Sequence, residues 1–577
     1  MKGDAFDLEV IKSSIVAISD EMFASLRRTS KSPIIYEVLD FACGLTDARG
    51  DMIAQGNGVT GFLGTLSFAV RSTLEKFGEA GLAPGDLVIV NDPYGGGGSH
   101  LSDVSLVQPV FHQGSIVGFS ASKAHWTEVG GKDPGSWTTD STEIYQEGLQ
   151  FPCVKIYDRG APIRGLIDLI AANVRLPDMT LGDLEAQAAA MRLGERRFRD
   201  LFDKHGRNAV LHALANLLDH GERMTGLALQ ELPKGVFEAE DWIDDDGIGN
   251  GPFETRVKVT ITDDSFVCDF AGTHPQVPGP VNCTATGLHA GVRSIFKAVT
   301  TPELPANEGN FRPLQVLCPP ATIFTAERPA PVSTYWETKN HVTDLVWKAL
   351  APVVPRRLPA GHHLSVCGTI VTGKHPETGE FFLLVEPQVG GWGAAKDRDG
   401  QSGQFPVGDG ETYVVPVEVA ETKYGVMVER FELHAPSAGA GRQRGGRGCI
   451  REYRVTSDEV TVTATFGRHE FPPWAVAGGR AGSPNEVRLL HADGREVVVG
   501  KCARYRLRKG EVVRLVTGTG GGWGSPMERS VAAVVEDVRN GYVSREEAER
   551  DYGVAVDESL KPTRLVAERR AATGLPR

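Results

Sequence analysis

A long stretch without proline, from Thr180 to Leu232, divides the chain into two parts of different composition. The stretch is rich in Ala, Leu, Glu and Arg, and its apolar residues recur at helical spacing, which predicts two or three α-helices. Gly206 and Gly221 are the natural breaks between them. Residues 179–232 are therefore expected to form a helical segment between two parts that are built differently.

The part before this segment, residues 1–178, mixes helices with short strands. Residues 6–31 carry apolar residues at helical spacing and predict an amphipathic helix that ends before Ser32 and Pro33. From Ile34 onward, short apolar runs alternate with glycine-rich turns, and one further helix is expected near 64–77. This pattern is typical of an α+β region.

The part after the helical segment, residues 233–529, is rich in β-structure. Strand-like segments are separated by proline and glycine, and helices are expected near 284–299 and 341–350. Residues 530–577 are charged and helical again and are expected to form a C-terminal tail. Because 577 residues exceed what one hydrophobic core normally holds, we expect a multidomain α+β protein with mixed short strands and helices and a β-rich C-terminal half.

Charge and cysteine content argue against several classes of protein. The net charge of -13 offers no basic surface to a phosphate backbone, so no nucleic-acid partner is expected. The start of the chain lacks a signal-peptide pattern and no apolar run approaches the length of a membrane span, so neither export nor membrane insertion is expected. The eight scattered cysteines form no C-x-x-C pair, which favours buried thiols in a reducing, cytoplasmic setting.

The segment from Asn91 to Asp103 is the most informative one for chemistry. It follows an apolar strand and contains four consecutive glycines, which allow a sharp turn or a close approach to a ligand. His100 and Asp103 stand three residues apart, and His125 follows the next apolar strand. Two imidazoles and a carboxylate on adjacent strand ends suit a divalent metal such as zinc, manganese or iron. The alternative is a chance spacing among fifteen histidines and a plain surface loop.

Two common catalytic motifs are missing from the sequence. It contains no G-x-x-x-x-G-K-[ST] loop, and the glycine cluster at 517–524 lacks the lysine that a nucleotide would need, so ATP is not expected to bind here in the P-loop manner. It also contains no G-x-S-x-G elbow, so a serine hydrolase of the α/β type is not supported.

Three segments in a fixed order carry a family resemblance. They read N-D-P-Y-G-G-G-G-S-H-L-S-D-V at 91–104, K-A-H-W-T-E-V-G-G at 123–131 and S-T-E-I-Y-Q-E-G at 141–148. Glycine-rich blocks follow at 390–394, 445–453 and 518–524. Together these segments resemble the hydantoinase B/oxoprolinase family over nearly the whole chain.

The resemblance implies an ATP-dependent enzyme of more than one subunit. Family members pair with, or are fused to, a hydantoinase A-type chain with an actin-like nucleotide fold, where ATP and Mg²⁺ are expected to bind. This chain resembles the B half and is expected to act in a hetero-oligomer on a small cyclic amide, such as a hydantoin, a lactam or an oxoproline-like ring. The alternatives are a subunit of an ATP-dependent ketone carboxylase of the acetone or acetophenone carboxylase type, and a non-catalytic assembly subunit.

The resemblance also implies a ligand set for the metal. An acidic residue near the start joins the histidines and the aspartate, which gives Asp40, His100, Asp103 and His125. Glu128, three residues beyond His125, is a candidate general base or a residue that orients a ligand. Asp92 is a candidate for holding a ligand imidazole, and the alternative for Asp92 is to cap the turn before Pro93.

The sequence departs from the family pattern at two places. Relatives often read H-I-P-V-H-L-G where this chain reads G-V-T-G-F-L-G at 58–64, so Gly58 and Phe62 replace two histidines. Relatives often read A-H-H-A-D-I-G-G where this chain has Trp126 and Glu128 in place of the second histidine and the aspartate. We expect a more apolar and aromatic pocket, and a changed metal preference is the alternative effect.

Three further groups of residues have a structural explanation beside a functional one. His362 and His363 are adjacent, and neighbours on a strand point to opposite faces, which argues against a second site. Trp392 and Trp523 stand among glycines and are expected to anchor loops in the core. A cluster of four arginines suits an anionic or phosphorylated intermediate, with surface ion pairing as the alternative. These arginines are Arg442, Arg444, Arg447 and Arg451.

Overall fold

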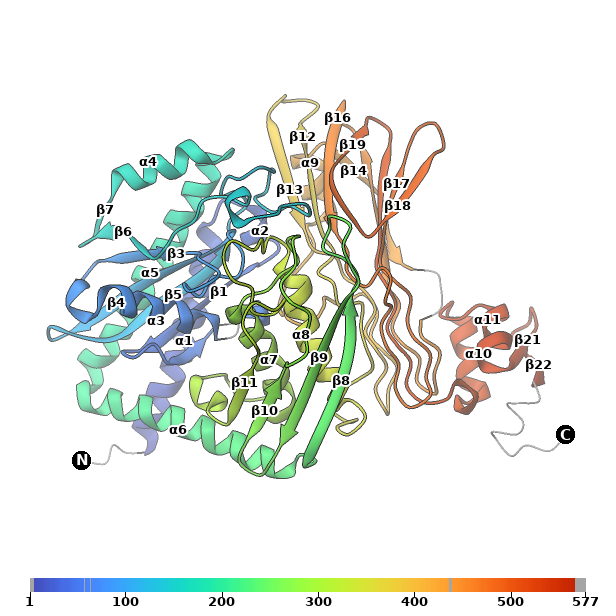
Figure 1. Cartoon of the computed structure of the whole chain (residues 1–577), viewed down its shortest axis with the longest axis horizontal. Coiled ribbons are helices and arrows are strands. Elements are labelled where there is room, and N and C mark those ends of the chain that lie inside the picture. The colour runs from blue at the N-terminus through green and yellow to red at the C-terminus, as the bar shows by residue number, and fades with distance from the viewer. Residues whose placement is uncertain (1–4, 57, 63, 435–437, 566–577) are drawn as a thin grey trace.

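The N-terminal part of the chain is built on a seven-stranded antiparallel sheet. A computed structural model describes residues 5–56, 58–62, 64–434 and 438–565 (Figure 1). The sheet has the order β2-β1-β5-β4-β3-β6-β7. Its central hairpin, β4 (Asp103–His112) and β5 (Ser115–His125), turns at Gln113 and Gly114, which both have positive φ, as a two-residue hairpin turn requires. The other strands are β1 (Phe41–Asp47), β2 (Met52–Gln55), β3 (Leu87–Val90), β6 (Val154–Asp158) and β7 (Ala161–Pro162).

Helices cover both faces of this sheet. α1 (Ala5–Thr29) and α5 (Pro177–His205) pack together on one face, and α3 (Thr65–Phe77) packs on the other. The alternation of β5 explains the two layers, because Phe119 and Ala121 share a core with α3 whereas the hydroxyl of Ser120 donates to Met191 O of α5. The short helices α2 (Pro33–Tyr36) and α4 (Arg164–Asn173) complete this part.

The two glycines predicted to break the helical segment behave differently. Gly206, with φ 82, separates α5 from α6 (Arg207–Glu231), as predicted. Gly221 lies inside α6, so its prediction as a break was wrong. A Cβ atom at Gly221 would lie 2.4 Å from Asn307 Oδ1, so this glycine allows close packing on a neighbouring loop.

Two buried helices and a four-stranded sheet form the middle of the molecule. The sheet has the order β11-β10-β9-β8, and α7 (Ala285–Thr300) packs against α8 (Tyr335–Leu350), which in turn contacts β8 and β9. Almost every side chain of α8 is buried, including several charged ones. The strands are β8 (Gly235–Ile243), β9 (Phe253–Ile261), β10 (Phe266–Asp269) and β11 (Leu314–Leu317).

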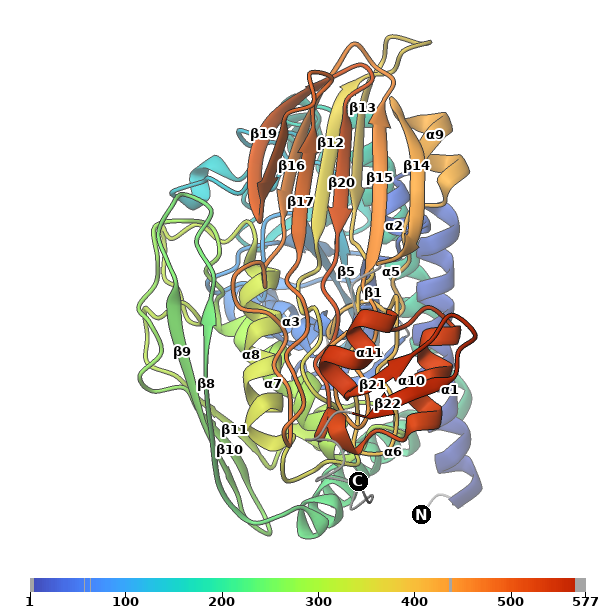
Figure 2. The ribbon, with the colours of Figure 1, turned by 90° about the vertical axis from the view of Figure 1, so that its right-hand side faces the viewer.

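The C-terminal half carries two further sheets that share one apolar core with the N-terminal part. The first has the order β13-β12-β16-β19 and the second the order β14-β15-β20-β17-β18 (Figure 2). The first contains β12 (Gly368–Lys374), β13 (Phe381–Glu386), β16 (Glu459–Thr465) and β19 (Lys501–Arg508). The second contains β14 (Val426–Leu433), which follows α9 (Val417–Lys423), and β15 (Cys449–Val455), β17 (Glu486–Leu490), β18 (Glu496–Val499) and β20 (Val512–Val516).

The late glycine blocks form a bundle of extended segments bonded through their backbones. Gly446 N donates to Trp392 O at 2.7 Å, and Gly520 N donates to Gly446 O at 2.9 Å. A Cβ atom at Gly445 would lie 1.9 Å from Gly520 O, so the segments touch too closely for any side chain. Trp523 is buried in the core, and Trp392 packs against the same core, as expected.

The C-terminal tail folds around a small core of its own. It contains α10 (Val531–Arg539) and α11 (Arg545–Tyr552), and also the paired strands β21 (Val554–Val556) and β22 (Pro562–Leu565), which the sequence did not predict. The end of the predicted helical tail, 566–577, lies outside the described residues. The chain is α+β with several sheets, as predicted, and the domain boundaries stay predictions. Within the described ranges, none of the helices has the length and apolar character of a membrane span.

Candidate active site

A cavity lies where the N-terminal sheet, α8 and the C-terminal half meet. It holds about 70 Å³ that the centres of water molecules can reach. One part of its wall is apolar and aromatic, with Ile34, Val59, Phe62, Trp137, Trp336, Val366 and Val385. The rest is polar and charged, with Asp40, His100, Asp103, His125, Tyr335, Lys339, Glu386, Asp409 and Thr412. A small ligand with an apolar body and a polar reacting group fits such a lining.

The sheet brings together the four residues expected to bind a metal. Asp103 opens β4 and pairs directly with His125, the last residue of β5. Asp40 precedes β1, the other neighbour of β5, and its carbonyl accepts a hydrogen bond from His125 N at 3.0 Å. His100 lies in the turn before β4, with its ring 5.1 Å from that of His125. All four side chains line the one cavity.

The carboxylate of Asp103 is held by three protein donors. Tyr335 Oη donates to Asp103 Oδ2 at 2.9 Å, and Ser99 Oγ donates to the same oxygen. His100 Nε2 lies 3.4 Å from Asp103 Oδ1. These contacts fix the orientation of Asp103 from the turn before β4 and from α8.

Burial and neighbouring charges set the protonation of the site. Burial raises the pKa of Asp40 well above its usual value, and the charges of Asp103 and Asp409 act in the same direction. Burial opposes ionisation of Asp103, but the neighbouring His100 holds the pKa of Asp103 below its usual range. Burial, with help from His100, lowers the pKa of His125 to about 3, so its imidazole is neutral near pH 7. A neutral imidazole is the form that binds a metal.

The residues present fit a divalent metal by their chemistry. Two imidazoles and two carboxylates are ligands that zinc, manganese and iron accept. The Nδ1 atoms of His100 and His125 are buried and have no hydrogen-bond partner among the residues that the structure describes, so both are available to bind an ion. In the described part of the chain, no three His, Cys, Asp or Glu side chains already surround a common point as metal ligands. Asp103 in particular faces its protein donors.

The two predicted catalytic carboxylates lie outside the cavity lining. Glu128 is fully buried and accepts hydrogen bonds from Gly130 N, Gly135 N and Ser136 Oγ, and it pairs with Arg175 at 2.9 Å. Because both of its oxygens are engaged, Glu128 holds its loop in shape, and its roles as a general base or as a residue that orients a ligand stay predictions.

Asp92 also has a structural role. Its Oδ1 accepts from Tyr94 N at 3.2 Å and pairs with Arg328 at 3.0 Å, so the alternative of a turn residue describes it better than a contact with a ligand imidazole.

The departures from the family pattern affect the cavity unequally. Phe62 and its neighbour Val59 line the cavity and make its wall apolar, as expected. Trp126 is buried in the core, where its Nε1 donates to Gln187 at 2.6 Å, and it does not line the cavity. Gly58 has φ 134, and a Cβ there would lie 2.5 Å from Phe41 O.

The sequence analysis missed the contribution of α8 and of one later loop. The helix was predicted near 341–350, but it begins at Tyr335. Tyr335 and Lys339, spaced by four residues, share the face that lines the cavity, and Trp336 lies beside them. The signal in the sequence that could have revealed this helix face was a tyrosine and a lysine at helical spacing among apolar residues. Asp409, between Gly408 and Gly410, gave no signal of comparable strength.

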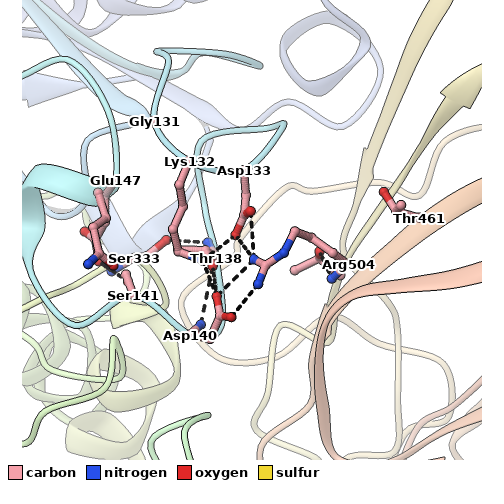
Figure 3. A network of polar contacts seen from close by, with 12 residues as sticks. Gly131, Lys132, Asp133, Thr138, Asp140, Ser141, Glu147, Ser333, Thr461 and Arg504 are labelled. Atoms are coloured by element: carbon pink, nitrogen blue, oxygen red, sulfur yellow. Dashed lines mark hydrogen bonds and ion pairs between the residues drawn. The ribbon is translucent and has the colours of Figure 1, made fainter.

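A loop at 130–147 contributes one residue to the cavity wall and is tied to the C-terminal half by polar contacts (Figure 3). It carries Trp137, whose ring packs edge-on against Trp336 at 5.1 Å. Arg504 of β19 pairs with Asp133 and Asp140, both at 2.6 Å. Lys132 bridges the same two carboxylates from inside the loop.

The end of this loop holds the entry to α8. Glu147 accepts hydrogen bonds from Ser141 Oγ at 2.7 Å and from the backbone N–H groups of Val332 and Ser333, both at 3.0 Å. Glu147 is buried, and burial raises its pKa to about 8. The third family-like segment therefore positions the helix that supplies Tyr335.

The remaining polar clusters belong to the interior. Arg444 pairs with Asp537 at 3.0 Å, and Arg451 pairs with Glu386 at 3.2 Å while its Nη2 donates to Val415 O. Both arginines are buried, so these two form neither an open anion site nor surface ion pairs, whereas Arg442 and Arg447 are partly exposed. His362 and His363 are buried away from the cavity lining and lie in extended loop, not on a strand.

Comparison with known proteins shows the family to which the chain belongs. Residues 4–526 match the model of the family described as hydantoinase B/oxoprolinase. The chain is 32% identical over 567 residues to the caprolactamase subunit beta of Pseudomonas jessenii, a match that covers 96% of each chain. It is 29% identical to 5-oxoprolinase 1 of Arabidopsis thaliana over 91% of this chain, which corresponds to 42% of that longer protein.

Solved structures share the fold. The crystal structure of the ATP-dependent caprolactamase from Pseudomonas jessenii matches with a TM-score of 0.92 at 30% identity and covers 99% of both chains. The nucleotide-free structure of acetone carboxylase matches with a TM-score of 0.91 at 18% identity, over 99% of this chain and 83% of that one. The second match, at its low identity, shows the fold alone.

Proposed function

The chain belongs to the hydantoinase B/oxoprolinase family, and we propose that it is the metal-binding subunit of an ATP-dependent enzyme that opens a cyclic amide. The observation that carries this proposal is that Asp40, His100, Asp103 and His125 line one cavity that also has an apolar wall. The relatives named caprolactamase and 5-oxoprolinase point to a lactam or an oxoproline-like ring. A hydantoin is the third candidate, since the family takes its name from it.

These four residues would hold a zinc, manganese or iron ion. When bound, such an ion lowers the pKa of a bound water toward about 7 and polarises a carbonyl group. Tyr335 fixes the carboxylate of Asp103 by its hydrogen bond, and His125 stays neutral at its buried position. The aromatic wall formed by Trp137 and Trp336 excludes bulk water and takes the apolar part of the ring.

Asp409, which also lines the cavity, is our candidate for transferring a proton. Its side chain is buried and Oδ2 has no hydrogen-bond partner among the described residues. Burial raises the pKa of Asp409 to about 7, with the nearby Lys339 opposing the shift, so its carboxyl group can both hold and release a proton near neutral pH. We assign it to protonation of the departing amide nitrogen.

The proposal includes a hydantoinase A-type partner that binds ATP and Mg²⁺. An unstrained amide resists attack, and transfer of a phosphoryl group to its oxygen makes the carbonyl carbon open to attack by water. The C–N bond then breaks to give an amine and an acyl phosphate, and a second water hydrolyses the acyl phosphate to the carboxylate and inorganic phosphate. The relative named subunit beta is part of a larger enzyme, which supports a hetero-oligomer. The eight free cysteines suit a reducing compartment, and we place the enzyme in the cytoplasm.

The activity test uses this chain purified together with a hydantoinase A-type partner. Hydantoin, 5-oxoproline and caprolactam are offered with and without ATP, and ring opening is followed by chromatography. We expect ring opening that requires ATP. A parallel reaction supplies acetone or acetophenone with labelled bicarbonate, because acetone carboxylase shares the fold. Incorporation of label into the ketone, with no ring opening, would replace the hydrolase by the carboxylase.

The metal is tested by elemental analysis of the purified chain. We expect close to one transition-metal ion per chain, and we expect a folded His100→Ala/His125→Ala variant to lose it, because both histidines are proposed ligands. His375→Ala, which lies outside the cavity, is the control. Equal metal in all three proteins would exclude these ligands, and unchanged ring opening by the double variant would favour a non-catalytic assembly subunit.

A further inference from the structure

The cavity contains a buried ammonium group that forms no ion pair with any described residue. Lys339 is 3% exposed and lines the cavity from α8. Among the described residues, its Nζ atom forms neither a hydrogen bond nor an ion pair. The two other buried lysines differ, since Lys123 Nζ donates to Gly97 O at 2.9 Å and Lys297 Nζ donates to Leu304 O at 2.7 Å. A buried charge normally has a partner, so Lys339 calls for one from outside the chain.

Two loops keep the space around this ammonium open. Gly61 N donates to Gly408 O, which joins the loop after β2 to the loop that carries Asp409. A Cβ atom at Gly61 would lie 2.3 Å from Lys339 Nζ, and one at Gly408 would lie 2.8 Å from it. Any other residue at these positions would crowd the Nζ atom. The two glycines therefore leave the room that the ammonium group occupies.

An electrostatic role toward the nearby carboxylates does not account for this geometry. The positive charge of Lys339 opposes the rise in the pKa values of Asp40 and Asp409, so all three groups sense one another. Among the described residues, neither carboxylate forms an ion pair with Nζ, and Asp409 Oδ2 has no hydrogen-bond partner. The ammonium is thus placed beside the carboxylates but bonded to neither.

We propose that Lys339 Nζ binds an anionic oxygen group of the substrate, a phosphoryl or carboxylate group, while the apolar wall of the cavity holds the hydrocarbon part. This inference rests on the proposed function and narrows its substrate to a small, largely apolar molecule that carries one anionic oxygen group when it occupies the cavity. An ammonium donates up to three hydrogen bonds and suits oxyanions of either kind. Phe62, Trp336 and Val385 supply apolar surface in the same cavity.

The test measures anion binding to the full-length chain by isothermal titration calorimetry. Inorganic phosphate and hexanoate are the two probes, because the first represents a phosphoryl group and the second a carboxylate on an apolar chain. We expect at least one of them to saturate the protein. Lys339→Met, which keeps the apolar stem, should weaken that binding at least about tenfold, because a hydrogen bond to a charged group is lost. Lys339→Arg should bind within about threefold of the parent, because it keeps the charge.

Lys374→Met, an exposed lysine outside the cavity, is the matched control and should bind like the parent. Circular dichroism checks that each variant is folded, and Lys339→Gln replaces Lys339→Met if that variant fails to fold. Saturation by phosphate alone assigns a phosphoryl group, and saturation by hexanoate alone assigns a carboxylate. Parent-like affinity of Lys339→Met for both probes, or no saturation of the parent by either, would overturn the inference.

Ring opening with the partner separates this inference from the proposed function. If ring opening takes place and Lys339→Met leaves KM, kcat and anion affinity unchanged, the inferred anion site is wrong and the proposed function stands. If anion binding depends on Lys339 but no cyclic amide is opened, the function fails and the anion site stands. If both hold, we expect Lys339→Met to raise KM for the cyclic amide at least about tenfold.

Discussion

The hydrogen bond from Tyr335 to Asp103 joins α8 to the proposed metal ligands, and it can be removed without changing the shape of the side chain. Tyr335→Phe should lower kcat/KM for ring opening by about tenfold to hundredfold, because residues that orient ligands carry effects of this size. The metal content of the variant after dialysis should fall as well. Tyr413→Phe, whose ring is half exposed, is the control. Full activity and full metal content in Tyr335→Phe would show that Asp103 needs no help from α8.

At the residue scale, the sequence predicted the first half of the site and missed the second. His100, Asp103 and His125 could be found because strand ends next to one another in an antiparallel sheet lie close in space, and Asp40 came from the family resemblance. Glu128 shared the spacing of a catalytic residue, but the N–H groups of its own loop occupy its carboxylate. Lys339 and Asp409 lie on elements more than 200 residues away from His125 in the chain, and a sequence pattern does not report such tertiary contacts.

Among the single elements, the loop at 130–147 is held to β19 by Arg504. Arg504→Met removes its ion pairs with Asp133 and Asp140, so the loop should open more often while the groups that line the cavity stay unchanged. We expect faster hydrogen–deuterium exchange of peptides from 130–147 and a KM raised severalfold, with kcat within about twofold. Arg506→Met, an exposed arginine on the same strand, provides the comparison. Unchanged exchange in Arg504→Met would show that Trp137 and its neighbours hold the loop without it.

The same loop should make stability depend on pH through Glu147. Its pKa is raised from 4.5 to about 8 by burial, so the folded state binds a proton that the unfolded state releases between these pH values. The stabilisation is complete below about pH 4.5 and is lost as the pH rises through about 8. Glu147→Gln keeps an oxygen to accept the hydrogen bonds but carries no charge, so its melting temperature should fall less between pH 6 and 9 than that of the parent. If the melting temperatures of the parent and of Glu147→Gln changed equally with pH, Glu147 would be ionised in the folded state.

The elements themselves were predicted well where one face of a helix or strand is apolar. The opening helix, the helix near 64–77 and the break at Gly206 agree with the structure. The start of α8 was missed because the helix is buried on all sides. Polar and apolar residues are mixed around it, so the sequence shows no clear apolar stripe. The glycine blocks pack against one another through their backbones, and such contacts leave no periodic pattern.

In the whole molecule, the cavity depends on parts of the chain that meet only in the folded state. The N-terminal sheet supplies the histidines, the middle part supplies α8, and the C-terminal half supplies Asp409 and the apolar wall around Val385. A buried ion-pair network connects these last two parts. Arg468, which follows β16, pairs with Asp241 of β8 at 2.8 Å and with Asp344 of α8 at 2.6 Å.

Removing Arg468 therefore tests whether the parts unfold together. Arg468→Met leaves the buried Asp344 without its guanidinium partner and leaves Asp241 with Lys348 alone at 3.4 Å, which should cost about 3–5 kcal/mol in free energy of unfolding. Because the network joins the middle sheet, α8 and the C-terminal half, we expect the whole unfolding curve in urea to move to lower concentration as one transition. Arg506→Met should leave the curve in place, because its contact with Glu459 is exposed. A new early transition in Arg468→Met, with the rest of the curve unmoved, would show that the C-terminal half unfolds on its own and that the cavity can open along this boundary.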